Sequence, residues 1–188
     1  MSSTRILGIS GSLRSQSFNT ALLREAKRLV EDDGEVTLDV VTLHGIPLYD
    51  GDVESEQGEP EAVSVLKRKI QDYDAIILST PEYNNGIPGV FKNAIDWLSR
   101  PSEAGKNIFS GRHIAVMGAS PGGFGTVMAQ SGWLPVLKTL GVQHWSGGRV
   151  LASKAHQLFS EQGVISDDRM RDQLKGFVQS FAEFVRSA

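Results

Sequence analysis

The sequence contains no cysteine among its 188 residues. This absence excludes disulfide bonds, zinc sites built from thiolates and catalysis by a cysteine nucleophile. No run of roughly 18 apolar residues occurs, so a membrane-spanning helix is not expected. The N-terminal apolar stretch is too short for a signal peptide. We therefore expect the protein to be cytoplasmic.

A strong positive charge is also absent. The 19 lysines and arginines are outnumbered by 22 acidic residues, which gives a net charge of -3. Proteins that bind nucleic acid or anionic membranes usually carry a basic surface, so neither is expected as the main partner. The composition is that of an ordinary globular protein, with 40% hydrophobic and 22% charged residues. Its length and lack of repeats predict one domain over residues 1–188.

Metal ligands are scarce as well. The four histidines are scattered without the spacing typical of a metal site, at His44, His113, His144 and His156. With no cysteine to complete a ligand set, no metal site is expected.

Short apolar runs alternate with longer amphipathic ones along the chain. The apolar runs predict strands at residues 5–10, 36–43, 74–80 and 113–119, with a weaker one at 149–152. Helical periodicity covers residues 18–33, 60–71, 88–99, 125–140 and 167–186, whereas the acidic segment 49–62 is expected to be a solvent-exposed loop. Such alternation predicts an α/β fold with parallel strands and helices on both faces. Ligands bind such sheets beyond the carboxyl ends of the strands.

The first unusual stretch leaves the first strand and reads GISGSLRSQSFNTALL, from Gly8 to Leu23. It lacks the glycine patterns typical of dinucleotide-binding folds and of P-loops. A hydroxyl-rich turn instead runs into a helix start, where free N–H groups and the helix dipole favour an anion. The donors are Ser12, Ser15, Ser17, Asn19 and Thr20, with Arg14 as countercharge for a phosphate. Taken alone, the stretch fits a helix cap on Ser17 with Arg14 in solvent equally well.

Two further stretches leave the third and fourth strands. TPEYNNGIPGVFKNAIDWL, from Thr80 to Leu98, combines prolines and glycines in a tight loop before a helix. This loop could direct backbone N–H groups from Tyr83 to Gly86 at the carbonyls of a ring, or it could be a structural turn. GASPGGFGT, from Gly118 to Thr126, could let backbone lie flat against a planar ligand, or it could be merely flexible.

Together, the motifs GSLRSQSFN, PEYNNGIPGVFKNAIDW and GASPGGFG resemble the NAD(P)H-dependent FMN reductase family, including its quinone and chromate reductases. The resemblance covers nearly the whole chain, in order, through the fourth crossover. It implies a flavodoxin-like three-layer sandwich whose five-stranded parallel sheet has the order 2-1-3-4-5. It also implies that FMN binds noncovalently at the carboxyl edge of this sheet.

The resemblance assigns three groups of residues to the cofactor. The phosphate would be held by Ser12, Arg14, Ser17, Asn19 and Thr20. The isoalloxazine would be lined by Pro81, Glu82, Tyr83, Asn84 and Asn85, and bordered on its other side by Ser120 and Gly122 to Gly125, with Gly122, Gly123 and Gly125 as the glycines. Glu82 could act through its backbone alone, with its side chain in solvent, and Tyr83 could shape access of the nicotinamide.

The implied activity is hydride transfer from NADPH or NADH to the flavin and then to a small acceptor such as a quinone, free flavin, azo compound or chromate. Flavin chemistry of this kind requires no side-chain acid or base, so no catalytic residue is assigned. The main alternative is a flavodoxin-type electron carrier without NAD(P)H turnover. Carriers of that type tend to be strongly acidic and to use a threonine-rich phosphate loop, unlike this chain. A flavodoxin-like module without cofactor is a third alternative.

The resemblance also implies a homodimer. The helices after Pro88 and Gly125 would meet their mates, because Val90, Phe91, Ile95 and Trp97 leave few polar positions to face water. A tetramer through charged contacts is less expected, because GGFGTVMAQSGW carries no charge.

Overall fold

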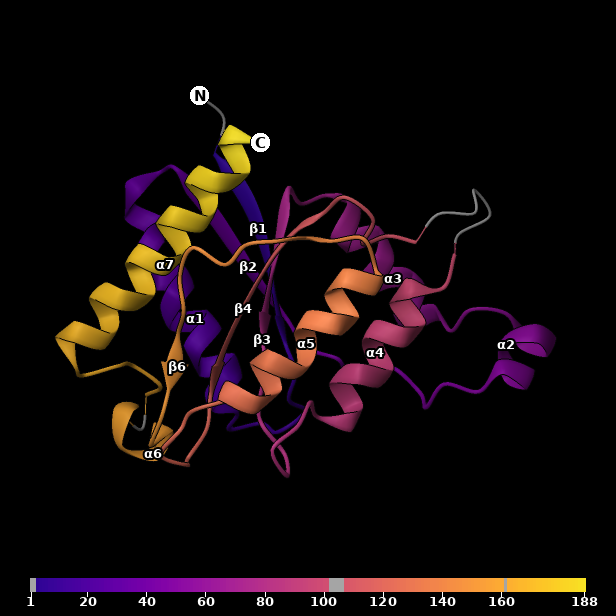
Figure 1. Cartoon of the computed structure of the whole chain (residues 1–188), viewed down its shortest axis with the longest axis horizontal. Helices are drawn as coiled ribbons and strands as arrows, with labels where there is room; N and C mark the ends of the chain where they lie inside the picture. Colours follow the sequence, from indigo (N-terminus) through magenta and orange to yellow (C-terminus); the bar gives the residue numbers. More distant parts are fainter. Residues whose placement is uncertain (1–2, 102–106, 161) are drawn as a thin grey trace.

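A parallel sheet lies between two layers of helices in the computed structural model, which describes residues 3–101, 107–160 and 162–188 (Figure 1). The strands are β1 (Thr4–Ser10), β2 (Val36–Val41), β3 (Ala75–Ser79), β4 (His113–Ala119), β5 (Gln143–His144) and β6 (Leu151–Ala152). The helices are α1 (Phe18–Val30), α2 (Gly51–Gln57), α3 (Glu61–Gln71), α4 (Gly89–Ser99), α5 (Val127–Thr139), α6 (Ala155–Leu158) and α7 (Asp168–Ser187), with a 3-10 turn, η1 (Glu31–Asp33), after α1. The sheet order is β2-β1-β3-β4-β5, and β6 also pairs with β4. The predicted fold class and strand order are confirmed.

The central strands are apolar on both faces because both faces are covered. Ile6, Ile77 and Met117 point into a core shared with α1 and α7. Leu7 and Leu78, one position along, point into a second core beneath α3, α4 and α5. Adjacent residues of a strand alternate between faces, so continuous apolar runs are what a doubly covered sheet requires. All pairs in this sheet are parallel, which brings the ends of β1, β3 and β4 to one edge.

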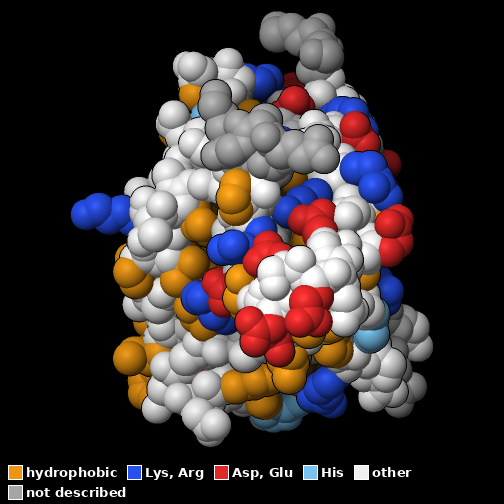
Figure 2. All heavy atoms as spheres, turned by 90° about the vertical axis from the view of Figure 1, so that its right-hand side faces the viewer, with side chains coloured by type: hydrophobic (Ala, Val, Ile, Leu, Met, Phe, Trp, Pro, Cys, Tyr) orange, Lys and Arg blue, Asp and Glu red, His pale blue; other side chains and the backbone are white. Residues whose placement is uncertain are grey.

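The acidic segment predicted to be a loop contains a helix, α2, so that prediction was wrong for residues 51–57. The Asp50 side chain accepts a hydrogen bond from the amide of Asp52 and caps the helix. Glu54 in α2 accepts hydrogen bonds from Arg100 at 2.9 Å and from the Tyr49 hydroxyl at 2.9 Å. These local contacts order a segment that hydrophobic periodicity does not reveal. Figure 2 shows acidic and basic side chains interspersed on the face that carries α2.

The strand predicted at residues 149–152 is observed as the two-residue strand β6, whereas β5, at residues 143–144, was not predicted. β5 pairs with the start of β4 and β6 pairs with its end. Between them Trp145 turns into the core and packs on Phe177 and Phe181, with ring centroids 5.1 and 5.5 Å away. Six residues, 145–150, therefore separate β5 from β6 at the sheet edge, a break that a pattern of apolar residues cannot show.

The predicted reason for dimerisation needs correction. Phe91, Ile95 and Trp97 are at most 1% exposed and fill the core beneath α4. Only Val90 of the four residues reaches the surface, with 36% of its area exposed. The apolar character of α4 is therefore explained within one chain.

Candidate functional site

The loop between β1 and α1 presents free backbone donors at a helix start. Ser17 caps α1, because its Oγ accepts a hydrogen bond from the amide of Thr20 at 3.2 Å. The amide groups of Ser12, Leu13, Ser15 and Gln16 make no hydrogen bond with any residue that the structure describes. Free amides at the positive end of a helix dipole form a site for an anion.

Arg14 supplies the positive charge beside these amides. Its side chain is exposed and forms no ion pair with the described residues. Its own amide donates to Ser12 Oγ at 3.3 Å, which shapes the turn. The helix-cap and the anion-site interpretations of this stretch are therefore compatible, because Ser17 caps α1 while the Arg14 side chain stays free to bind an anion.

Close packing fixes the position of this loop. The amide of Gly11 donates to the carbonyl of Ser79 at 2.9 Å, and a Cβ on Gly11 would lie 2.1 Å from the Phe91 ring. Only glycine permits so close an approach. On the other side, His44 Nε2 lies 3.1 Å from the carbonyl of Leu13 and must donate to it. Sequence reasoning missed this contact, because the two residues are 31 positions apart.

Two predicted phosphate ligands have their side chains engaged inside the protein. Asn19 donates to the carbonyl of Ala119 and accepts from its amide, both at 2.9 Å, and Ser79 Oγ donates to Asn19 Oδ1 at 3.1 Å. Thr20 Oγ1 shares a hydrogen bond of 2.8 Å with Ser10 Oγ. The Asn19 side chain therefore joins α1 to the ends of β3 and β4, and that of Thr20 joins α1 to β1.

The loop after β3 forms a tight two-residue turn. Tyr83 and Gly86 exchange both backbone hydrogen bonds, at 3.2 and 3.1 Å, while Asn84 and Asn85 have positive φ values of 51° and 59°. Positive φ at both central positions is typical of a type I′ turn and suits asparagine. The turn uses the amides of Tyr83 and Gly86, so of the four expected donors only those of Asn84 and Asn85 stay available.

Glu82 does not point into solvent. Its Oε2 accepts hydrogen bonds from the amides of Met128 at 2.8 Å and Ala129 at 2.9 Å, in the first turn of α5. The N-cap residue Thr126 makes no side-chain cap. Glu82 therefore caps α5 from a loop 46 residues earlier, and its side chain ties the loop after β3 to this helix.

We expect Glu82→Ala to lower the free energy of unfolding by about 1–2 kcal/mol, because two amides lose a charged acceptor at a helix start. Denaturation in urea measures this loss. Glu82→Gln keeps an acceptor oxygen and should lose less. An alanine variant as stable as the wild type would contradict the capping role.

The loop after β4 leaves open backbone beside these elements. Ser120 Oγ donates to the carbonyl of Gly125 at 2.6 Å, which closes the loop. A Cβ on Gly123 would meet nothing within 4 Å, and one on Gly122 would meet only Ser120 Oγ at 3.6 Å. Gly125 has a φ of 63°, which favours glycine. Exposed backbone without side chains is thus accessible at Gly122 and Gly123, whereas Gly125 is buried.

The three loops converge on a small hollow of about 50 Å³. Its lining includes most of the predicted site residues, namely Ser12, Arg14, Ser17, Asn19, Pro81, Glu82, Tyr83 and Ser120. Phe18, Ala119 and Pro121 also line it, and sequence reasoning missed these three. Thr20, Asn84, Asn85, Gly122, Gly123 and Gly125 do not line it. A larger hollow of about 610 Å³ adjoins it and shares Ser17 and Phe18.

Comparison with known proteins places the chain in a family. Residues 4–157 match the family described as NADPH-dependent FMN reductase. An NAD(P)H-dependent FMN reductase of Pseudomonas aeruginosa is 42% identical over 97% of this chain and 95% of its own length. A 2-hydroxy-1,4-benzoquinone reductase of a Burkholderia species is 34% identical over 97% and 96%. The structure of FerB, an NAD(P)H:acceptor oxidoreductase of Paracoccus denitrificans, superimposes with a TM-score of 0.83 at 32% identity, covering 98% of each chain. The chain belongs to the NADPH-dependent FMN reductase family.

Proposed function

We propose that the protein is an FMN-dependent oxidoreductase that takes hydride from NADPH or NADH and passes reducing equivalents to a small acceptor such as a quinone. The observation that carries the proposal is the anion site at the start of α1, which lies at the same edge of the sheet as the turn after β3 and the open glycines after β4. The names of the relatives agree with it.

The residues present fit FMN. A phosphate monoester needs several donors and a countercharge, and the four free amides of this loop together with the Arg14 side chain supply both. Ser12 and Ser17 are placed to donate from their hydroxyl groups, whereas Asn19 and Thr20 hold the strand ends and helix in position. These contacts would be charge-assisted and would provide much of the binding free energy.

The chain's own residues position the reactants and exclude water. The bound flavin would supply the hydride chemistry. The amides of Asn84 and Asn85 would donate to the polar edge of the ring, as donors aimed at developing negative charge do in other enzymes. Gly122 and Gly123 leave room for a second planar molecule, and Tyr83, 47% exposed, stands at the rim where it would limit its access. No proton transfer by a side chain is required.

Steady-state oxidation of NADPH and NADH by the FMN-loaded protein tests this function. We expect turnover with 1,4-benzoquinone that depends on added FMN and that saturates in the nicotinamide. Free flavin, an azo dye and chromate in parallel reactions rank the acceptors. An FMN-loaded protein that oxidises neither nicotinamide with any acceptor would be a flavodoxin-type carrier, and a protein that takes up no FMN would be a module without cofactor.

A homodimer is part of the proposal. Exposed apolar side chains lie on or beside α4 and α5, at Val90 with 36%, Phe124 with 84% and Met128 with 52% of their area exposed. Exposed apolar side chains of this kind favour contact with a partner. The mass of the same preparation by light scattering should be twice that of the chain. No helix in the described part of the chain is long and apolar enough to cross a membrane; the cytoplasmic location stays a prediction.

A further inference from the structure

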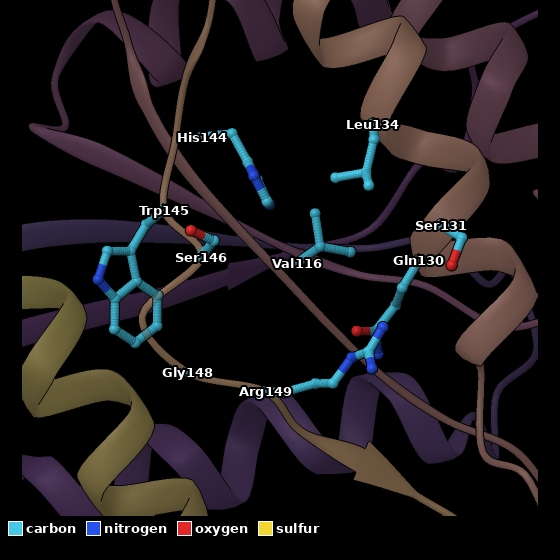
Figure 3. Close-up of a pocket in the computed structure, with 9 residues that line it drawn as sticks. All are labelled: Val116, Gln130, Ser131, Leu134, His144, Trp145, Ser146, Gly148 and Arg149. Atoms are coloured by element: carbon cyan, nitrogen blue, oxygen red, sulfur yellow. The ribbon is translucent and has the colours of Figure 1, made fainter.

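A separate hollow of about 310 Å³ lies between α5 and the chain segment 144–149 (Figure 3). Val116 of β4 lies at its centre, His144 and Leu134 point into it from one end, and Arg149 reaches across the other end. None of its lining residues belongs to the hollow at the candidate cofactor site. Its volume is at the lower end of the range for small-molecule sites, which begins at about 300 Å³.

The sheet has an open position on the floor of this hollow. Trp145 donates its amide to the carbonyl of Ile114 at 2.9 Å, and Gly118 donates to the carbonyl of Val150 at 3.2 Å. Along a strand, the N–H and C=O groups of successive residues point in turn toward one neighbouring strand and then the other. Those of Val116 therefore point to the same side as those of Ile114 and Gly118. No hydrogen bond joins them to any residue in the described ranges on that side. Val116 is only 7% exposed, so a donor and an acceptor are left open at a nearly buried position.

The open position beside Val116 results from the residues that leave the sheet between β5 and β6. Trp145 folds back over Gly147 and Gly148, where an added Cβ would lie 2.7 Å from the indole in each case. Beyond these glycines, Gln173 donates to the carbonyl of Arg149 and Gln130 to that of Val150, both at 2.8 Å. The hollow is therefore held open by packing and by hydrogen bonds on both sides.

The charge that lines this hollow is positive and comes from Arg149. Arg149 is exposed and pairs with no acidic group of the residues described, and no acidic residue lines the hollow. At the other end, burial lowers the pKa of His144, so its ring is neutral at pH 7 and offers one donor and one acceptor. Val116 and Leu134 make the middle apolar. A guanidinium fork matches the two oxygens of a carboxylate.

We propose that this hollow binds a small aromatic carboxylate with a hydrogen-bonding substituent on the far side of its ring, as in 4-hydroxybenzoate. The carboxylate lies against Arg149, the ring lies over Val116 and beside Leu134, and the substituent reaches His144. The open main-chain groups of Val116 serve the polar atoms of the ligand or a water bound with it. This site is independent of the flavin, because it shares no residue with the cofactor loops.

Calorimetric titration of the FMN-loaded protein with 4-hydroxybenzoate tests the proposal. We expect a dissociation constant below about 1 mM for a ligand of this size. Phenol, which lacks the carboxylate, should bind at least about tenfold more weakly, and Arg149→Met should weaken 4-hydroxybenzoate by about ten- to hundredfold. The cofactor-free protein should bind 4-hydroxybenzoate with the same affinity as the FMN-loaded protein.

Two further variants separate charge from damage to the fold. Arg68→Met removes an exposed arginine on α3, far from the hollow in sequence and on another helix, and should bind like the wild type. Leu134→Glu places a negative charge at a position that is 49% exposed and should abolish binding while circular dichroism stays unchanged. Equal affinity of Arg149→Met and wild type, equal affinity for phenol, or competition between the probe and FMN would overturn the proposal. Each of these outcomes leaves the oxidoreductase function standing.

Discussion

Asn19→Ala should lower the free energy of unfolding by about 3–5 kcal/mol, because it removes three hydrogen bonds and leaves both buried main-chain groups of Ala119 without a partner. Asn19 is 3% exposed, and its side chain pairs with both main-chain groups of Ala119, whereas the hydroxyl of Ser79 also has the main-chain carbonyl of Asn19 as an acceptor at 3.2 Å. For a chain of this length the melting temperature should fall by roughly 6–20 °C. Thermal and urea denaturation of the cofactor-free protein measure the effect without any contribution from FMN.

Asn93→Ala is the matched control for this variant. Asn93 also bridges two segments, since it accepts from the amide of Tyr49 and donates to the carbonyl of Pro47, both at 2.8 Å, but these bonds are exposed. Water can replace the lost partners there, so the cost should stay near 1 kcal/mol, about the value of an ordinary hydrogen bond. Equal losses in the two variants would show that burial of the Asn19 network adds nothing to stability.

Arg14→Ala should weaken FMN binding by about ten- to hundredfold, the value of one charge-assisted hydrogen-bonded contact of about 1.5–3 kcal/mol. The side chain is exposed and has no ion pair among the residues described, so its removal should not affect stability. Quenching of flavin fluorescence during titration gives the dissociation constant.

Riboflavin provides the discriminating measurement for Arg14. It carries the same ring without the phosphate, so Arg14→Ala should bind riboflavin as the wild type does while its preference for FMN falls. Arg14→Lys keeps the charge without the guanidinium fork, so its FMN affinity should lie between those of the wild type and Arg14→Ala. Unchanged FMN affinity in Arg14→Ala, or an equal loss for riboflavin, would remove Arg14 from the phosphate site.

The fold and the general place of the site could be predicted from sequence, because both follow from local patterns. Continuous apolar runs such as AIILS in β3 require cover on two faces, and parallel strands bring their exits to one edge. The prediction could not separate residues that face a ligand from residues that hold the loops. Asn19 bonds to a residue 100 positions away and Glu82 to residues 46 and 47 positions away, so nothing in the local sequence marks either role.

The errors have a related cause. Helix α2 depends on a cap by Asp50 and on contacts of Glu54 with Arg100, which is 46 residues away. The apolar residues of α4 were assigned to a partner because their own chain's core could not be located from the sequence. Strand β5 was not predicted, because it is only two residues long and is followed by Trp145, which packs in the core. In each case a tertiary contact overrides a local pattern.

Glu82, Asn19 and His44 each bind a site loop to a different part of the chain before any ligand arrives. The conformational entropy of ordering these loops is therefore lost during folding, and little remains to be lost when a cofactor associates. Association should then resemble the meeting of two rigid bodies, with a fast on-rate and a small entropic penalty. Substitutions that loosen these ties should slow cofactor capture even where every group that touches the cofactor is intact.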